Sequence, residues 1–543
     1  MTSKNIVLCS DGTGNKGGYG EDSNVYKTYK AVDVTTGKAH QYTFYDQGVG
    51  TDKSDTHKNK YLTALSGAFG FGFQKNVVHL YHFLARCYKP GDRIFLFGFS
   101  RGAATVRAFA GFLHACGLVD LKHAQGPQGF DSDKFEALVE EALDCYRHRR
   151  EDPARCQAFK AKYSIQGQGY APNGHLHIHF IGVWDTVSAL GFPEDFSVLL
   201  QGVGRFLDWA TDRVPAWKHH FYDYELNDSI QHAYQALAID DNRQTFRPKI
   251  WDETRFNQTV EQVWFAGVHS NVGGGYPRTG MSDVALVWML EKAVAHGLVL
   301  YDDVLKTYRE SANVYDKLYD SRDGIAIYYR YGPRDLAQLT KAKLKGQVQL
   351  HYSAYRKLKE FSEGYAPDGL PPRFEVIDVV DPARPDGSRT RFSVDALENQ
   401  GKPEHQNKPT WPTLEADAKQ VIRTRKYLYR AFVEVTMLII IVAGVMWKNP
   451  PDAVTALNDC ETSHVQIASV AVAAGSKACD DAVPTGRDFF SVQQKVVNLP
   501  DTGAYAACQP GEQPVFCAES QNRPLRLLGD ILRYLTPVYF ENF

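Results

Sequence analysis

Short apolar segments alternate with longer amphipathic segments through the first 300 residues. The pattern predicts buried strands over residues 6–9, 93–99, 177–184 and 262–268, and helices over residues 74–87, 101–114, 230–239 and 283–296. Such alternation is typical of a mostly parallel sheet that is covered by helices on both faces. We therefore expect an α/β fold of the α/β-hydrolase type, with its reactive groups at the carboxyl ends of the strands.

Composition and charge exclude several classes of protein. Lys and Arg total 61 and Asp and Glu total 63 among 543 residues, so the chain has no overall field that gathers nucleic acid. Apolar residues make up 43% and charged residues 23%, which excludes a disordered or wholly membrane-embedded chain. A chain of this length holds about two to four domains, so a core large enough for an enzyme is available.

A glycine-flanked serine stands at the end of one predicted strand. The string GFSRG joins the strand over 93–99 to the following helix, and its glycines are Gly98 and Gly102. In such a turn the glycines permit a strained strand-to-helix connection that lifts the serine hydroxyl above the sheet edge. A serine hydroxyl is a weak nucleophile unless a base takes its proton. We therefore expect Ser100 to be a nucleophile with a base nearby.

Two further polar residues follow predicted strands and complete a candidate catalytic triad. Asp185 and His269 each come directly after a buried strand. Ser100, Asp185 and His269 occur in the chain order of the α/β-hydrolases. In that arrangement His269 takes the serine proton and Asp185 orients the imidazole. The alternative is that these are ordinary loop residues, since the chain has 18 histidines, and Asp283 is the second candidate for the acid.

Backbone N–H groups beside the nucleophile are needed to stabilise the developing oxyanion. One donor is expected from Arg101, the residue after the nucleophile. The other is expected from the loop after the first strand, at Gly12 or Thr13. These positions form the predicted oxyanion hole.

No cofactor or metal site is predicted. The loop after the first strand lacks both the spacing of a dinucleotide-binding glycine motif and the lysine of a phosphate-binding loop. His175, His177 and His179 alternate, so a strand would place them on one face. No Cys or carboxylate accompanies them at ligand spacing, which argues against a metal ion.

The segment over 427–447 is long and apolar enough to cross a membrane. Its 21 residues would form a helix about 31 Å long, roughly one hydrocarbon core. Arg430 and Glu434 interrupt its first turns, and the alternative is a buried helix over 435–447 in a soluble domain. Basic residues are concentrated on its N-terminal side, so the positive-inside rule predicts a cytoplasmic catalytic domain and a periplasmic tail, in a single-pass inner-membrane protein. A soluble secreted effector is the alternative.

The cysteines agree with this topology. The first residues leave no room for the apolar stretch of a secretory signal, so we expect the first domain to fold in the cytosol. Four cysteines occur late in the chain, in the expected periplasmic tail: Cys460, Cys479, Cys508 and Cys517. An oxidising compartment would allow them to form two disulfides, and the alternative is four reduced thiols.

Several long strings carry a family resemblance. They are LCSDGTGN (8–15), YDQGVGT (45–51), GDRIFLFGFSRGAATVRAFAGFLHACGLV (91–119), FIGVWDTVSALG (180–191), QALAIDDNRQTFRP (235–248) and VWFAGVHSNVGGGYP (263–277). Over about the first 295 residues the chain resembles the α/β-hydrolase domain of the first type VI secretion lipase-effector family, which is shared with many bacterial and fungal proteins.

The resemblance implies a serine esterase acting on glycerophospholipids, a phospholipase A with no metal requirement. The family's motifs place its triad at Ser100, Asp185 and His269. The chain departs from the family pattern at Asn271, where an aspartate is usual, and at Gln235 and Tyr222, where histidines are usual. Asn271 removes a negative charge close to the base, which would either lower the basicity of His269 or only change the hydrogen bonds of the loop. Together the departures put the substrate preference in question more than the triad.

The expected organisation follows from these features. A catalytic core over 1–300 contains an apolar insertion over 187–229, which is a lid or an extra packed helix. An appended helical or irregular region follows over 301–410, and its residues 382–409 are expected to be an exposed connector. Then come a basic segment over 411–426, the membrane helix over 427–447 and the tail over 448–543.

We expect a membrane-anchored phospholipase, a toxin or defence effector restrained by an immunity or regulatory protein. The alternatives are an esterase or thioesterase acting on a smaller substrate, and a non-catalytic membrane-anchored binding module. The sequence does not indicate an oligomeric state.

Overall fold

The computed structural model describes residues 3–12, 14–48, 68–166, 176–187, 222–255, 258–323, 331–360, 362–365, 367, 369–380 and 389–395. All of them belong to one compact unit, Met1–Ala431. The expected membrane helix, most of the expected lid, the tail with its four cysteines, and Thr13 lie outside the described residues. Within the described part of the chain, no helix combines the length and the apolar character needed to cross a membrane.

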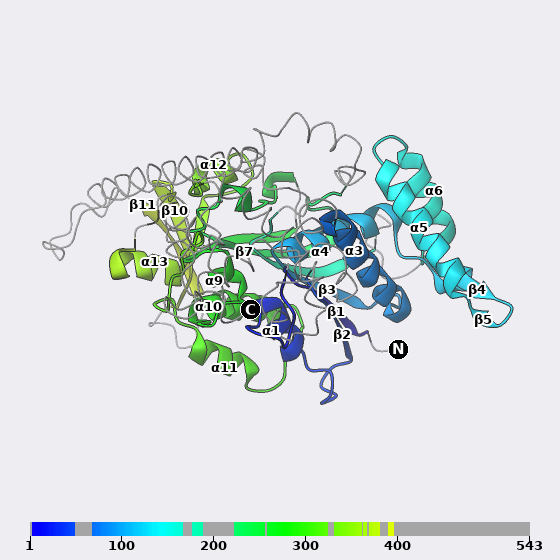
Figure 1. Cartoon of the computed structure of the whole chain (residues 1–543), viewed down its shortest axis with the longest axis horizontal. Coiled ribbons are helices and arrows are strands. Elements are labelled where there is room, and N and C mark those ends of the chain that lie inside the picture. Colours follow the sequence, from blue (N-terminus) through cyan, green and yellow to red (C-terminus); the bar gives the residue numbers. More distant parts are fainter. Residues whose placement is uncertain are drawn as a thin grey trace, which may run out of the picture. The chain divides into compact units, whose positions relative to one another are not determined.

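A mostly parallel sheet is the centre of the described unit (Figure 1). Its strand order is β11-β10-β9-β8-β7-β6-β3-β1-β2. Every neighbouring pair is parallel except β10 and β11. The strands are β1 (Asn5–Ser10), β2 (Gln41–Asp46), β3 (Arg93–Phe99), β6 (Ile178–Trp184), β7 (Ile230–Ala238), β8 (Thr259–Phe265), β9 (Val348–His351), β10 (Arg373–Val380) and β11 (Arg389–Asp395). A separate hairpin joins β4 (Gln125–Gly126) and β5 (Gly129–Phe130).

Helices cover both faces of the sheet. On one face lie α3 (Ala68–Cys87) and α4 (Arg101–Cys116), with α5 (Ser132–His148) and α6 (Pro153–Tyr163) packed against α4. The other face carries α1 (Asn24–Ala31), α9 (His269–Gly273), α10 (Gly280–Ala295) and α11 (Val304–Ser311) (Figure 1). The short helices α12 (Leu336–Thr340) and α13 (Tyr352–Lys359) contact the β8–β10 end of the sheet. Short 3-10 turns occur at Leu121–Ala124, Gln244–Phe246, Glu253–Arg255 and Ser362–Gly364.

The alternation of side chains along each strand explains the two covered faces. In β1, Ile6 and Leu8 belong to the core beneath α3 and α4, whereas Val7 and Cys9 belong to the core beneath α1 and α10. All four side chains are fully buried. Because both faces of the strand need apolar residues, the strand is a continuous apolar segment, which is the sequence signature of a parallel sheet.

One predicted helix is wrong. The segment over 230–239 forms strand β7, which pairs with β6 on one side and β8 on the other. Its last six residues are all buried, so both faces of the strand are covered. Periodicity does not separate a short, doubly buried strand from a buried helix, and the alanines of this segment favour a helix in isolation.

The sheet also extends beyond the expected core. Strands β9, β10 and β11 come from the region over 301–410 that was expected to be helical or irregular. Strand β11 lies within the expected connector and ends the sheet as an antiparallel edge strand. Arg389 and Arg391 place charge on this edge. Charged side chains keep an edge strand from pairing with a further strand, and they also make the segment resemble a loop in the sequence.

The strand order fixes where a site forms. Strand β1 lies between β2 and β3, so the chain order reverses between β1 and β3. In open α/β sheets, ligands bind outside the carboxyl ends of the strands at such a reversal, where the two following loops separate. The loops that follow β1 and β3 therefore border the expected crevice.

Candidate active site

Ser100 occupies a strained turn between β3 and α4. Its backbone has φ 57° and ψ −121°, outside the regions that residues with a side chain normally adopt. Its N–H donates to the carbonyl oxygen of Trp184 at 3.0 Å, and its own carbonyl accepts from Val187 at 3.4 Å. These bonds hold the turn against the end of β6. A strained serine at a strand-to-helix turn is the geometry of a nucleophile elbow.

The two glycines of the elbow permit close packing of backbones. A methyl group on Gly102 would lie 2.1 Å from the carbonyl oxygen of Ser10, at the end of β1. A methyl group on Gly98 would lie 2.6 Å from the carbonyl oxygen of Gly102. Both distances are far below contact distance, so only glycine allows α4 to begin this close to β1 and β3. The predicted elbow therefore has a steric explanation at both positions.

Asp185 and His269 are joined as predicted. Nδ1 of His269 lies 2.5 Å from Oδ2 of Asp185, and both side chains are buried. Asp185 directly follows β6 and has a positive φ of 40°, and His269 begins α9 after β8. A carboxylate only accepts hydrogen bonds, so Nδ1 carries the imidazole proton and Nε2 is left as the basic nitrogen.

The base lies beside the nucleophile turn. The ring of Phe99, the residue before Ser100, lies against the His269 ring with centroids 4.6 Å apart. The edge of Phe246 packs against the same imidazole at 5.2 Å. Nε2 of His269 is buried and has no hydrogen-bond partner within the described part of the chain. It accepts no hydrogen bond from Ser100 in this structure, and such contacts often tighten only when substrate binds.

Burial and charge set the protonation of the pair. Burial lowers the pKa of His269 below its ordinary value of 6.5, and the Asp185 carboxylate opposes this only in part. Burial alone would raise the pKa of Asp185, but the charge of Arg334 and the hydrogen bond from His269 hold that pKa well below its usual range. At neutral pH the site therefore holds a neutral imidazole and an ionised carboxylate, the state that a general base requires.

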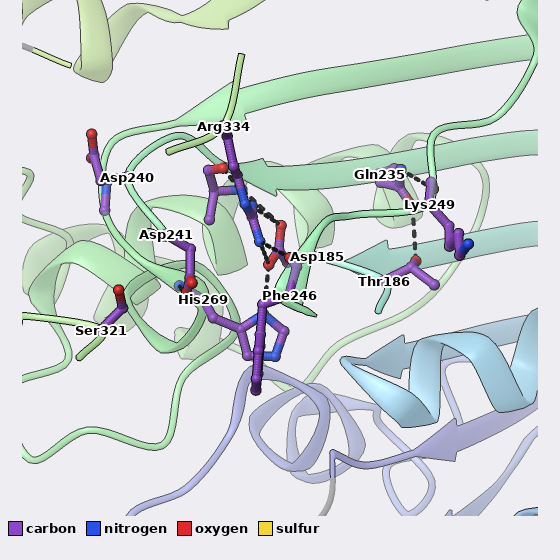
Figure 2. A network of polar contacts seen from close by, with 12 residues as sticks. Asp185, Thr186, Gln235, Asp240, Asp241, Phe246, Lys249, His269, Ser321 and Arg334 are labelled. Carbon is purple, nitrogen blue, oxygen red and sulfur yellow. Dashed lines mark hydrogen bonds and ion pairs between the residues drawn. The ribbon is translucent and has the colours of Figure 1, made fainter. Parts of the chain in front are cut away.

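Sequence reasoning missed Arg334. Its guanidinium is fully buried and forms a fork on Asp185, with Nη1 2.6 Å from Oδ1 and Nη2 2.8 Å from Oδ2. Figure 2 shows the Arg334 side chain extending to the Asp185 carboxylate, with the rings of His269 and Phe246 beyond it. Arg334 lies in the loop before α12, away from every catalytic string. A lone arginine in a polar loop gives no sequence signal that predicts this contact.

The predicted oxyanion hole is tied to a second buried carboxylate. Oδ2 of Asp11 accepts from Ser23 at 2.5 Å and from Tyr45 at 2.7 Å. Oδ1 accepts the N–H of Gly12 at 2.7 Å, so that N–H is engaged with Asp11 in this structure. A methyl group on Gly12 would lie 3.2 Å from Cβ of Ser100, which places the loop beside the nucleophile. Arg101 is the first residue of α4, as expected of the other donor.

The second candidate for the acid does not reach the base. Asp283 lies in α10 and pairs with Lys27 at 2.6 Å, and its other oxygen accepts from Thr279 at 2.9 Å and from Ser311 at 2.8 Å. These contacts account for both oxygens of Asp283, and Asp185 is the carboxylate that holds His269. Asp283 therefore connects α1 with α10 through its ion pair with Lys27.

Two departures from the family pattern have local explanations. The side chain of Asn271 donates to the carbonyl oxygen of Lys317 at 3.1 Å, which an aspartate cannot do, so this residue fastens a neighbouring loop. Gln235 lies within the sheet, where its amide oxygen accepts from Thr186 at 2.8 Å and from Arg107 at 3.2 Å. Both residues therefore belong to the support of the site.

In the histidine row over 175–179, His179 has hydrogen-bond partners within the protein. Both ring nitrogens of His179 are engaged, with the side chain of Gln231 at 2.7 Å and the carbonyl oxygen of His296 at 2.8 Å. His175 lies outside the described residues. Among the residues that the structure describes, no group of three or more His, Cys, Asp or Glu is arranged to hold a metal ion.

Comparison with protein families and curated proteins gives two matches. The model described as "T6SS, Phospholipase effector Tle1-like, catalytic domain" matches residues 4–292, more than half of the chain. The Saccharomyces cerevisiae protein YEL023C, which is uncharacterised, is 29% identical over 202 residues. The aligned part is 35% of this chain and 28% of the yeast protein.

Two solved structures show a weaker likeness. An uncharacterised protein from Pseudomonas aeruginosa is 18% identical, with a TM-score of 0.32 over 58% of this chain and 49% of that chain. The Tle1 effector bound to the VgrG spike from the type 6 secretion system is also 18% identical, with a TM-score of 0.28 over 51% of this chain and 52% of that chain. The chain thus spans about half the length of each solved protein.

Proposed function

Because the chain belongs to the family of Tle1-like phospholipase effectors of the type VI secretion system, we propose that it is a serine esterase of the phospholipase A type. Its substrates are the acyl esters of glycerophospholipids. The observation that carries the proposal is the 2.5 Å hydrogen bond between His269 and the buried Asp185, beside the strained Ser100. The buried, unpartnered Nε2 of His269 supplies the proton acceptor that the serine needs.

The reaction has two halves. Oγ of Ser100 attacks the ester carbonyl carbon while its proton passes to Nε2 of His269, and the tetrahedral intermediate forms. The ester bond then breaks, the lysophospholipid leaves as an alcohol that takes the proton from Nε2, and the acyl group stays on Ser100. Water attacks this acyl-enzyme, gives a proton to His269, and releases the fatty acid as the serine regains its proton. Asp185 stabilises the imidazolium formed in each half.

The oxyanion of each intermediate requires N–H donors. The N–H of Arg101, at the start of α4, is the first, because the helix N-terminus carries partial positive charge. The loop over 11–14 supplies the second, from Gly12 or Thr13. Since the N–H of Gly12 bonds to Asp11 in this structure, its use in catalysis requires this loop to turn when substrate binds.

The site acts next to a bilayer. The apolar segment over 427–447 anchors the chain as a single-pass inner-membrane protein, with the catalytic unit in the cytoplasm and the four late cysteines in the periplasm. The apolar insertion over 187–229 serves as a lid over the acyl chains. An anchored phospholipase endangers the membrane that holds it, so an immunity or regulatory protein restrains it.

A reporter fused after Phe543 tests the topology and should behave as periplasmic. Cytoplasmic behaviour of the reporter rejects this topology, and release of the chain from membranes favours a soluble secreted effector.

The activity is tested on the purified full chain with phospholipid vesicles and with a short-chain ester, and products are identified by mass spectrometry. We expect a fatty acid and a lysophospholipid from wild type, and loss of both from Ser100→Ala. Ser164→Ala is the matched control, because it removes a buried serine hydroxyl that bonds only to the carbonyl of Cys116.

Three outcomes contradict the proposal in different ways. Hydrolysis that survives Ser100→Ala rejects the nucleophile. Activity on the short ester alone rejects the lipid substrate and favours the smaller-ester alternative. Absence of activity on both substrates in wild type, together with binding to vesicles, favours a non-catalytic membrane module.

A further inference from the structure

The guanidinium of Arg334 donates two hydrogen bonds to the Asp185 carboxylate and two to backbone carbonyl oxygens. Besides the fork on Asp185, Nη1 donates to the carbonyl oxygen of Ala238 at 2.6 Å and Nη2 to that of Phe246 at 2.6 Å. Ala238 ends β7 and donates its own N–H to Asp185 at 3.0 Å. Phe246 packs its ring edge on His269. The guanidinium thus contacts both the acid and the residue that forms one wall of the base (Figure 2).

The loop that carries Arg334 is fastened on two sides. Gly332 donates to the carbonyl oxygen of Asn242 at 2.9 Å, and Tyr331 bridges to Arg243, in the loop after β7. On the other side, a methyl group on Gly369 would lie 1.6 Å from the carbonyl oxygen of Arg334, so this glycine permits direct backbone contact. The backbone that carries Arg334 is therefore held in place by contacts that do not involve Asp185.

From this geometry we propose that Arg334 is a positioning residue of the catalytic centre, which holds the Asp185 carboxylate in the plane that receives Nδ1–H of His269. The inference rests on the proposed serine esterase mechanism. It assigns a role in that mechanism to a residue beyond the end of the family match at residue 292. The catalytic unit therefore includes the region that supplies β9, β10 and β11.

The fork accounts for the orientation of Asp185. The carboxylate accepts from both arms of one guanidinium, so its plane follows the plane of the arginine. Lysine cannot reproduce this, because an ammonium group is a point charge without the planar fork. Loss of the fork allows the carboxylate to rotate, and misplacement of a catalytic group by about 1 Å costs about 100-fold in rate.

The charge of Arg334 has a separate consequence. The charged groups that act on the His269 ring are Asp185 and, from the loop after β7, Asp241 and Arg243. Arg334 is near it as well, because Nη2 of Arg334 and Nδ1 of His269 contact the same Oδ2 of Asp185, at 2.8 Å and 2.5 Å. Two like unit charges about 5 Å apart repel each other, at an effective dielectric constant of about 20, by an energy that corresponds to a pKa shift of roughly two units. Removal of the guanidinium therefore favours the imidazolium. The acid limb of the pH profile, where reactivity falls because His269 becomes protonated, then moves to higher pH by about one to two units.

These two effects are separated by Arg334→Lys and Arg334→Met. The readout is inactivation by a fluorophosphonate, in which Oγ of Ser100 bonds to phosphorus, fluoride leaves and His269 takes the serine proton. The maximal inactivation rate, the apparent binding constant and the pH profile from 5 to 9 are measured on the full chain. This probe does not depend on the identity of the lipid substrate.

We expect Arg334→Lys to inactivate about 100-fold more slowly than wild type, with an acid limb within about 0.5 units of wild type because its charge remains. Arg334→Met should also be slower, with its acid limb raised by about one to two units. The binding constant should change less than about threefold in both, since Arg334 is fully buried behind Asp185.

Lys4→Met is the matched control. Lys4 forms a buried ion pair with Asp92 at the amino ends of β1 and β3, opposite the site. Its removal should cost comparable stability and leave both the inactivation rate and the acid limb unchanged.

Each other result rejects the inference. If Arg334→Lys folds and is inactivated at the wild-type rate with the wild-type acid limb, the fork does not position Asp185. An unshifted limb in a folded Arg334→Met shows that the charge does not act on His269. If Arg334→Lys does not fold, Arg334 acts on the fold alone, and the inference is equally rejected. Failure of wild type to react at Ser100 instead rejects the proposed function.

Discussion

Replacing Ser100 by glycine should stabilise the protein while abolishing its activity. The backbone at Ser100, with φ 57° and ψ −121°, is disfavoured for a residue with a Cβ atom and accessible to glycine. Such strain costs about 1–3 kcal/mol. Glycine itself costs about 0.5–1 kcal/mol through the flexibility of the unfolded chain. We therefore expect Ser100→Gly to be more stable than Ser100→Ala by about 1 kcal/mol, since alanine retains the strained Cβ atom.

The comparison is measured by urea unfolding of the full chain, followed by tryptophan fluorescence. The assay reports on the sheet, because four tryptophans are fully buried within it or against it: Trp184, Trp251, Trp264 and Trp288. Ala115→Gly, in the last turn of α4, is the control for an unstrained position and should lose about 1 kcal/mol. If Ser100→Gly is instead less stable than Ser100→Ala by this ordinary amount, the backbone is not strained and the elbow argument fails.

Three further predictions follow from the site. Gly102→Ala should lower the free energy of unfolding in urea by about 1–3 kcal/mol, because its methyl group would overlap a carbonyl oxygen of β1. Gly346→Ala is the control and should be near neutral, since the space around Gly346 is open. Equal losses in the two variants contradict the packing argument. The acid limb of kcat/KM on a soluble ester should have its midpoint below pH 6.5, since burial lowers the pKa of His269 and the neutral form is the base; a midpoint above 6.5 refutes this. Asp185→Asn should lower kcat about 10⁴-fold, while Asp283→Asn should stay within about threefold; the reverse result exchanges their roles.

The three candidate catalytic residues can be recognised in the sequence because Ser100 and Asp185 directly follow buried strands and His269 follows one after a short loop. Strands β3, β6 and β8 are apolar enough to be recognised, and parallel strands bring their carboxyl ends to one edge. Ser100, Asp185 and His269 therefore converge although 169 positions separate the first from the last. Strand β8 begins and ends three residues earlier than predicted, so residues 266–268 separate it from His269, which still lies at the carboxyl end of the strand.

Other elements are not predictable in this way, for two physical reasons. The segment of β7 is buried on both faces and short, so its composition satisfies a helix and a strand equally, and pairing with β6 and β8 decides the outcome. Strand β11 lies at an edge, where charged residues are favoured, so its sequence resembles a loop. In both, the structure depends on neighbours that are distant in the chain.

Arg334 shows why the support of a site is harder to predict than its reacting groups. Breaking a buried ion pair typically costs about 3–5 kcal/mol, whereas replacing both partners by apolar residues is often neutral. In the proposed mechanism Asp185 is charged and stabilises the imidazolium, and Arg334 supplies the cation that the buried carboxylate requires. The chemistry therefore fixes Asp185 at a strand end, while the fold decides that a loop beyond the family match supplies the arginine. It follows that Asp185→Asn destabilises the protein as well as its reaction, because it leaves the Arg334 guanidinium buried without a counterion.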